Sequence, residues 1–311
     1  MMYADTYDKL HKIETSPEAL ALTREFLAQR LRVFMYKEEP VLICFPDNGP
    51  ESFGGIVGQA VRACGGVPVF WGQDYRWKVL LKQAFNTHAH TIVAHPLVVL
   101  GLMKVAKATA TPLYIHNVVL GGYPYARWML DGIKKGLDCR VWGCYSVRSG
   151  PVVVGFTCDR EAGIHIRDDR FKAVVLGNEG EPLPDPKRGR LMFASREDPE
   201  LVYDPQETST LLHQPCSCGC DAPRIVETVY TGTDNPSKSM LEERFLAWSS
   251  ILDYRATQTE SGIDLELVVF PGESLPKIPS CAKLTIRPWR PEEDIPFYME
   301  ENFLKLSEKY W

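Results

Sequence analysis

Residues 41–71, VLICFPDNGPESFGGIVGQAVRACGGVPVFW, place a short apolar run on either side of a longer amphipathic segment. The outer runs have the length of buried strands, and the segment between them carries apolar residues at helical spacing before glycine ends it. Apolar runs begin at residues 41, 67, 91, 113 and 139, so successive starts lie 22 to 26 residues apart. That interval fits one strand plus one crossover helix. The sequence therefore predicts an α/β fold in which βα units over residues 41–150 form an open, mainly parallel sheet.

The sequence becomes β-rich after residue 150. The runs PVVVGFTC, FKAVVLG and RLMFAS are typical of strands, and the turn-rich EPLPDPKRG separates the last two. The polar run TGTDNPSKS at 231–239 is typical of a boundary, and we expect a helix near residues 240–248 and two further strands beyond it. The sequence thus predicts a core over residues 1–230, with its β-rich part at 151–230, and a small α+β C-terminal domain over residues 231–311.

Charge and hydropathy exclude several classes of function. The chain holds 35 Lys and Arg against 40 Asp and Glu, a net charge of −5, so no positive field favours nucleic acid or an anionic membrane. The most apolar stretch, residues 91–108, contains Lys104 and Lys107, whereas a membrane span needs about 20 nearly uncharged residues. The N-terminus lacks a secretory pattern, and an odd number of cysteines, nine, favours a reducing compartment. We expect a cytoplasmic protein without nucleic-acid or membrane partners.

The segment CSCGC at 216–220 is the sharpest chemical signal in the chain. Thiolate and imidazole are the preferred ligands of zinc, and a closed structural site needs four of them in a tetrahedron. The favoured set of ligands is Cys158, His165, Cys216 and Cys218. Either Cys220 or His213 could replace one of them. The alternative is a turn of free thiols beside an ordinary buried cysteine, because Cys-x-Cys is tighter than the usual Cys-x2-Cys clip.

Two segments follow predicted strands at the place where ligands bind in an open α/β sheet. The first, GGY, precedes a helix, and the second, WGCYS, carries aromatic groups that could stack on an adenine or aryl ring. The predicted pocket residues are Gly121, Gly122, Tyr123, Trp142, Gly143, Cys144, Tyr145 and Ser146. The alternatives are a simple βα turn and a set of core aromatics. Four histidines between residues 88 and 116 stand beside no orienting carboxylate in sequence, so we interpret them as structural.

Four segments carry motifs that occur together in one enzyme family. They are GGYPYARWMLDGI at 121–133, WGCYSVRSGPVVVGFTC at 142–158, GIHIRDDRF at 163–171 and QPCSCGCDAPRI at 214–225. The third is similar to Gly-x-His-x-x-Glu-Asp-x-Phe, and the fourth to Cys-x-Cys-Gly-x-x-x-x-x-Ile. In this order they resemble the phenylacetate–CoA ligase branch of the adenylate-forming enzymes, the AMP-dependent synthetase/ligase superfamily.

The resemblance implies a set of cofactors and ligands. Members of the branch hold a metal through residues that match Cys158, His165, Cys216 and Cys218, which strengthens the prediction of structural zinc. The resemblance also implies ATP or AMP with Mg²⁺, coenzyme A, and a small carboxylic acid or nucleotide as partner. On that basis residues 121–123 line the acyl and adenine pocket, and residues 142–146 flank the nucleotide.

Several catalytic motifs of the family are altered. No segment before residue 41 resembles the Ser/Thr/Gly-rich loop that grips ATP phosphates, so we expect the N-terminal lobe to be missing. Ser146 falls near the glutamate that helps to hold magnesium, and a hydroxyl cannot supply that charge. Residues 203–208, YDPQET, replace the segment of the ribose-binding aspartate, where Asp204 or Glu207 could compensate. No catalytic residue is assigned, because no lysine stands out among Lys277, Lys283, Lys305 and Lys309.

These departures favour a divergent homologue of the aryl/acyl-acid–CoA ligases, degenerate in ATP-dependent adenylation, with structural zinc and a retained small-molecule pocket. The alternative is an active ligase that activates a small aromatic acid for transfer to coenzyme A. A third hypothesis is a zinc-stabilised scaffold whose pocket is filled by its own side chains. The apolar end at 303–311, FLKLSEKYW, could dock on its own core or on a second copy in a homo-oligomer.

Overall fold

A parallel sheet forms the centre of the molecule. The computed structural model describes residues 13–72, 74–122, 126–146, 152–230, 237–260, 262–272, 274–275 and 283–297. The parallel strands are β1 (Pro40–Ile43), β2 (Val67–Phe70), β3 (Thr91–Ala94), β4 (Asn117–Gly121) and β5 (Arg140–Ser146). They pair in the order β5-β4-β3-β1-β2. The predicted βα units are therefore present, although the run that starts at residue 113 becomes a strand only at Asn117.

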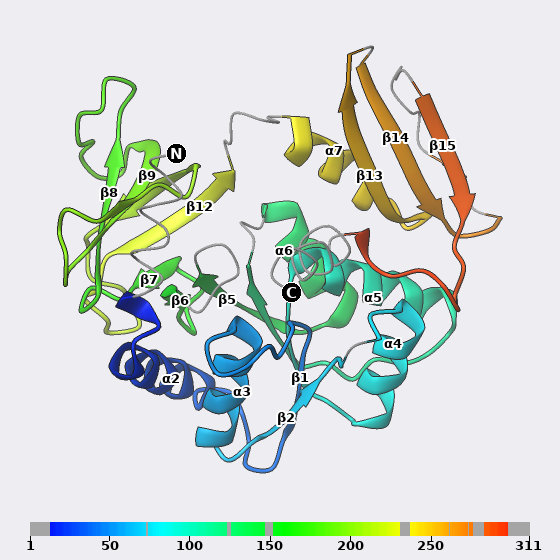
Figure 1. The fold of residues 1–311 in the computed structure, drawn as a ribbon, viewed down its shortest axis with the longest axis horizontal. Helices are drawn as coiled ribbons and strands as arrows, with labels where there is room; N and C mark the ends of the chain where they lie inside the picture. The colour runs from blue at the N-terminus through cyan, green and yellow to red at the C-terminus, as the bar shows by residue number, and fades with distance from the viewer. Residues whose placement is uncertain are drawn as a thin grey trace.

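Helices cover both faces of these strands (Figure 1). One layer holds α2 (Pro17–Leu31) and α3 (Phe53–Ala63), and the other holds α4 (Trp77–Asn86), α5 (Pro96–Ala108) and α6 (Arg127–Leu137). Successive residues of a strand point to opposite faces, so Leu42 packs with α4 and α5 while Ile43 packs with α2 and α3. Burial on both faces explains why the strands read as continuous apolar runs.

One glycine sets the distance between two of the helices. A Cβ atom at Gly101 of α5 would lie 2.0 Å from a ring carbon of Trp77, the first residue of α4. Trp77 is fully buried in the core of this layer. Any larger residue at position 101 must therefore displace the indole or separate the helices.

The sheet continues without a break into an antiparallel half. Its strands are β6 (Val153–Thr157), β7 (Ile164–Ile166), β8 (Phe171–Leu176), β9 (Arg188–Ser195), β10 (Val202–Tyr203), β11 (Glu207–Leu212) and β12 (Arg224–Tyr230). β6 pairs with β5, and the order beyond it is β7-β12-β11-β9-β10, with β8 on β9. We call β6 to β12 the β-rich half. It has its own apolar core, which includes Phe171, Leu191 and Phe193.

A separate three-stranded sheet follows the helix α7 (Ser237–Leu246). It consists of β13 (Ile251–Thr259), β14 (Gly262–Val269) and β15 (Lys283–Pro288), in that order. Figure 1 shows this sheet beyond α5, on the opposite side of the molecule from β8 and β9. The predicted fold class, a mainly parallel sheet with a β-rich part and a small α+β part, is confirmed. Residues 231–236 of the predicted boundary run at 231–239 lie outside the described residues, and residues 237–239 begin α7. The division into domains stays a prediction.

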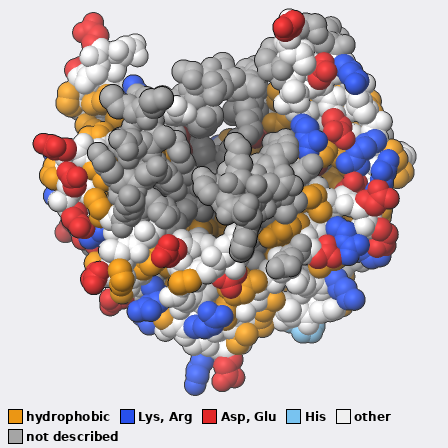
Figure 2. Space-filling view, in the orientation of Figure 1, with side chains coloured by type: hydrophobic (Ala, Val, Ile, Leu, Met, Phe, Trp, Pro, Cys, Tyr) orange, Lys and Arg blue, Asp and Glu red, His pale blue; other side chains and the backbone are white. Residues whose placement is uncertain are grey.

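The described surface carries charges of both signs. Figure 2 shows Lys and Arg side chains interspersed with Asp and Glu on the face that it displays. This is the distribution expected from a nearly balanced composition. Among the described residues, no helix combines the length and apolar character that crossing a membrane requires.

Candidate functional site

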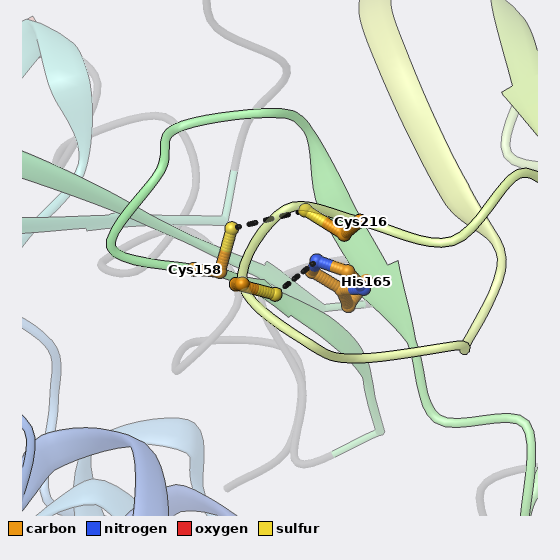
Figure 3. A group of neighbouring side chains, drawn as sticks. Cys158, His165 and Cys216 are labelled. Atoms are coloured by element: carbon orange, nitrogen blue, oxygen red, sulfur yellow. Dashed lines mark hydrogen bonds between the residues drawn. The ribbon is translucent and has the colours of Figure 1, made fainter.

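Two loops of the β-rich half bring the four predicted metal ligands together (Figure 3). Cys158 directly follows β6 and His165 lies in β7, while Cys216 and Cys218 lie in the loop between β11 and β12. One donor atom from each residue lies within 4.8 Å of the other three. Residues separated by about 50 positions in sequence thus form a single cluster, which we call the Cys3His cluster.

The spacing of the donor atoms suits a tetrahedral metal. Cys158 Sγ lies 3.9 Å from Cys216 Sγ, and Cys218 Sγ lies 3.5 Å from His165 Nε2. In a tetrahedral zinc site two sulfurs lie about 3.8 Å apart, and a sulfur and a nitrogen about 3.6 Å apart. Both separations in the cluster are close to these values. The donor set is one that zinc can use, and these two separations are compatible with a tetrahedral ion.

Hydrogen bonds outside the cluster orient its ligands. His165 Nδ1 lies 3.3 Å from the carbonyl oxygen of Ala222 and can donate to it, which leaves the lone pair on Nε2 for a metal. Arg224 donates to the carbonyl oxygens of Ala162, at 3.0 Å, and Gln214, at 3.1 Å. One guanidinium group thus joins the two loops that carry the ligands. Arg224 lies opposite His165 in the β12–β7 pairing, which explains its reach.

The local electrostatics favour the metal-binding protonation state of two residues of the Cys3His cluster. Burial lowers the pKa of His165 below its usual 6.5, so the imidazole is neutral at pH 7. Burial opposes ionisation of Cys216, but hydrogen bonds from the backbone and thiol of Cys218 and from the thiol of Cys158 hold the pKa of Cys216 below 9.0. A neutral imidazole and thiolates are the forms that bind zinc. The paired thiol of Cys218 shifts the other way, because burial raises its pKa to about 11.

The two alternative ligands take other positions. Cys220 is not in the Cys3His cluster, although its carbonyl oxygen accepts from the backbone N–H of Cys216 at 3.1 Å and closes the turn. His213 Nδ1 lies 3.0 Å from a carboxylate oxygen of Asp185 and is also outside the cluster. The structure therefore favours the set with Cys158, His165, Cys216 and Cys218 over either replacement.

The predicted pocket residues divide between the edge of the sheet and its interior. Gly121 ends β4 and Gly122 follows it, while Tyr123 lies outside the described residues. Ser146 ends β5, and its buried hydroxyl has no hydrogen-bond partner among the residues described. An unpaired buried hydroxyl at the carboxyl end of a parallel strand is where a ligand or water is expected. Gly121, Gly122 and Ser146 thus have positions that suit a pocket.

Trp142 and Cys144 lie in the protein core. The Trp142 side chain is 3% exposed, stacks on Phe34 with ring centroids 4.4 Å apart, and donates to Asn117 Oδ1 at 3.2 Å. Burial raises the pKa of the Cys144 thiol to about 12, so it remains protonated. These contacts favour the alternative of core aromatics for this face of β5, and a pocket role for the two residues stays a prediction.

Tyr145 forms a buried pair with Glu207. The phenol donates to Glu207 Oε2 at 3.0 Å, and the glutamate is 6% exposed. Burial raises the pKa of Glu207 to about 8, so the carboxyl group is mostly protonated at pH 7. Asp204 forms an ion pair with Arg190, with 3.1 Å between Oδ2 and Nε, and its other oxygen accepts from the backbone N–H of Gln206 at 2.8 Å. Both carboxyl groups proposed to replace the ribose-binding aspartate therefore have partners within the protein.

Gly143 lines a cavity on the α6 side of the sheet. The cavity has a volume of about 590 Å³ and extends from α6 to the start of β12. Leu130, Ile164 and Ile225 make its apolar walls, and an ion pair between Lys134 and Glu161 lies at its edge. The volume is in the range of small-molecule sites, about 300 to 1,000 Å³. Gly143 is the only predicted pocket residue in the described part of the chain that lines this cavity.

His95 is a candidate site residue that sequence analysis did not select. It directly follows β3 and caps α5, where its Nδ1 accepts from the backbone N–H of Leu97 at 3.1 Å. The strand order 5-4-3-1-2 makes the gap between β1 and β3 the topological switch point, where open α/β sheets bind ligands. His95 lies at this point and is fully buried. The usable signal was His-Pro directly after a parallel strand, with proline at the first helical position.

No protein-family model matches the sequence, and no curated protein matches it. Solved structures match it by fold. 2-Hydroxyisobutyryl-CoA ligase in the postadenylation state matches 82% of this chain at 12% identity with a TM-score of 0.64, and benzoate CoA ligase from Burkholderia xenovorans LB400 matches 86% at 9% identity with a TM-score of 0.57. The fold is that of the adenylate-forming acid–CoA ligases. The chain spans only 60% and 62% of the lengths of these two ligases.

A further match concerns how the two sheets are placed. The thioesterification-state structure of 2-hydroxyisobutyryl-CoA ligase matches 95% of this chain and 72% of its own length, with 13% identity and a TM-score of 0.61. An alignment that omits 5% of 311 residues, about 16, includes at least part of the three-stranded sheet, whose strands hold 9, 8 and 6 residues. The match to the acid–CoA ligase fold therefore reaches into the part of the chain that holds the three-stranded sheet.

Proposed function

We propose that the chain is a divergent homologue of the acid–CoA ligases, on the phenylacetate–CoA ligase branch, that keeps a small-molecule pocket and has lost ATP-dependent adenylation. The shared fold supports the ancestry. The pocket we propose lies at the carboxyl ends of β3, β4 and β5, where His95, Gly121, Gly122 and Ser146 lie. A small carboxylic acid, aromatic in keeping with the branch, or a nucleotide is its proposed ligand.

The proposed loss of adenylation rests on one observation: Asp204 and Glu207 both bond to other side chains of the protein. Adenylation needs groups that hold the ribose and stabilise the charge that develops as pyrophosphate leaves. Asp204 is paired with Arg190, and Glu207 is buried against Tyr145. Neither carboxyl group is placed to hold a ribose, because Asp204 already pairs with Arg190 of β9 and Glu207 with Tyr145 of β5. Ser146 also lacks the charge that a magnesium ligand would supply.

Zinc has a structural role in this proposal. Cys158, His165, Cys216 and Cys218 would hold the ion, and the bound ion would supply a tetrahedral cross-link between the two loops. All four positions are then taken by protein atoms, so no position remains for water or substrate. The residues therefore fit a structural metal that stabilises the β-rich half.

The alternative is an active ligase that transfers an aromatic acid to coenzyme A. The hydroxyl of Ser146 has no hydrogen-bond partner within the described part of the chain, and the imidazole of His95 lies at the switch point. Both favour this alternative, because they provide polar groups where a ligand would bind. The ligases of the same fold were solved with acyl-AMP and coenzyme A. A segment supplied by a longer protein or a second chain would then have to provide the phosphate-binding loop.

Calorimetric titration of the zinc-replete protein tests the proposal. We expect heat with a mixture of aryl acids or with AMP, no heat with ATP and Mg²⁺, and no exchange of pyrophosphate into ATP. His95→Asn should weaken acid or AMP binding at least about tenfold, since it removes the buried ring at the switch point, whereas the exposed His88→Asn control should not. Binding of ATP with pyrophosphate exchange would establish the active ligase instead. Absence of binding heat with every ligand would support the third hypothesis, a zinc-stabilised scaffold without a ligand.

A further inference from the structure

The three-stranded sheet shares an apolar core with the large one. Leu252, Val268, Phe270 and Phe297 belong to the same buried cluster as the side chains of α4 and α5. Leu97 of α5 and Trp128 of α6 pack in turn against the core of the three-stranded sheet. Interfaces between domains that move freely are usually more polar than this. The interface therefore resembles the interior of a single domain.

A lysine from α5 crosses this interface. Lys104 Nζ donates to the carbonyl oxygen of Leu246 at 2.7 Å and to that of Ile251 at 2.6 Å. Leu246 is the last residue of α7, where carbonyl groups have no partner within the helix and the helix dipole is negative. Ile251 is the first residue of β13. One ammonium group from the large sheet's helix layer thus satisfies both ends of the α7–β13 turn.

The segment after β15 is tied to α4 by backbone and side-chain bonds. The backbone N–H of Trp77 donates to the carbonyl oxygen of Asp294 at 3.2 Å, and Arg76 donates to that of Glu292 at 3.0 Å. The Asp294 carboxylate accepts from Arg287 at 2.8 Å, which holds this segment against β15. The three-stranded sheet is therefore attached at two places, through Lys104 on α5 and through residues 76–77 at the start of α4.

We propose that Lys104 is a latch that fixes the three-stranded sheet against α5, so that the chain keeps its two sheets in one arrangement. The arrangement is built from contacts inside the chain and needs no ligand. This inference goes beyond the proposed function and does not depend on whether the pocket binds an acid or a nucleotide. Its consequence is that a ligand added to the pocket leaves the placement of β13 to β15 unchanged.

Hydrogen–deuterium exchange on the full chain tests the latch. Lys104→Met keeps the aliphatic stem and removes both hydrogen bonds, so amides of residues 245–254 should exchange about tenfold faster than in the wild type. Lys107→Met, on the exposed side of α5, is the matched control and should leave these amides within about twofold of the wild type. Equal exchange in the two variants would overturn the proposal.

A second measurement needs no variant. Small-angle X-ray scattering of the wild type should give the same radius of gyration with and without saturating AMP, and with and without the aryl acids that calorimetry shows to bind. A ligand-dependent change in radius would contradict the single arrangement, even if Lys104→Met failed to fold. Calorimetry on the same samples reports binding separately, so a failure of the proposed function and a failure of the latch give different results.

Discussion

The two halves of the large sheet are stabilised in different ways. Strands β1 to β5 lie between two layers of helices and bury mostly apolar side chains on both faces. The β-rich half has one apolar core and also buries charged or titratable groups, among them His165, Arg167, Glu207 and Arg224. It alone contains the Cys3His cluster.

This difference has a thermodynamic consequence. Apolar packing responds little to pH or chelators, whereas a buried carboxyl group or a metal site couples stability to protons and ions. The β-rich half should therefore lose stability under conditions that leave the parallel half intact. Four predictions test the contrast.

The largest effect is expected from the double variant Cys216→Ser, Cys218→Ser. Loss of two ligands should abolish stoichiometric zinc and lower the free energy of unfolding by about 5 kcal/mol, because the cross-link between the two loops is lost. Metal content and thermal unfolding are the measurements. Cys220→Ser, in the same loop but outside the cluster, is the control and should keep the metal. Retention of zinc by the double variant would contradict the assignment.

Glu207→Gln should change the pH dependence of stability. The folded pKa is about 8 and the ordinary value 4.5, so between these pH values the native state holds a proton that the unfolded state has released. Stability that is present below pH 4.5 is therefore lost as pH rises through 8. Between pH 5 and pH 8 the wild type should therefore lose about 3 kcal/mol of unfolding free energy through this group. The variant has no titrating group at this position and should not show that loss.

Urea unfolding between pH 5 and pH 8 checks this prediction. The exposed Glu200→Gln serves as the control, because its carboxylate is solvated and should leave the slope unchanged. Parallel curves for the wild type and Glu207→Gln would show that Glu207 does not carry the titration.

Gly101→Ala tests the parallel half. The added Cβ would lie 2.0 Å from the ring of Trp77, so the variant should lose about 2 kcal/mol of stability through overpacking. At Gly132 of α6 the nearest atom is 3.9 Å away, and Gly132→Ala should gain up to about 1 kcal/mol from helix propensity. Neither variant should change zinc content, and chemical unfolding with metal analysis measures both effects. A zinc loss in Gly101→Ala would show that the two halves are coupled.

The smallest effect is expected from Trp142→Phe. The change removes the hydrogen bond to Asn117 Oδ1 and keeps most of the stacking on Phe34, so stability should fall by about 1 kcal/mol. Ligand affinity should not change, since Trp142 lies in the core. The exposed Trp248→Phe is the control for stability. A large change in the affinity for an acid or a nucleotide, measured by calorimetry, would show that Trp142 contributes to the pocket.

The Cys3His cluster could be predicted because its chemistry is restrictive. Few residue types bind zinc, and a Cys-x-Cys turn with an upstream cysteine and histidine leaves few sets of four. The pocket could not be predicted in the same way. Alternation along β5 places Trp142, Cys144 and Ser146 on one face of the strand. The sequence does not show that this face packs against α2 and Phe34, and so it does not show which of the three side chains are buried in the core.

Charged residues show the same limit. The sequence suggests Asp204 and Glu207 as candidate ligand-binding carboxylates. In the structure Asp204 pairs with Arg190, 14 residues away, and Glu207 accepts a hydrogen bond from Tyr145, 62 residues away. Lys104 is one of two lysines in its helix and has no distinctive local pattern, yet it donates to carbonyl groups more than 140 residues away. Partners so distant in sequence leave no local pattern.

The sequence by itself determined the βα rhythm, the change to a β-rich half and the four candidate metal ligands. These follow from periodicity and from ligand chemistry, which are local properties of the chain. Only the tertiary structure decided that Trp142 is a core residue, that Glu207 is buried with Tyr145, that His95 lies at the switch point and that Lys104 reaches across to α7. The physical reason is that burial and pairing depend on which distant segments pack together, and strand order sets that packing.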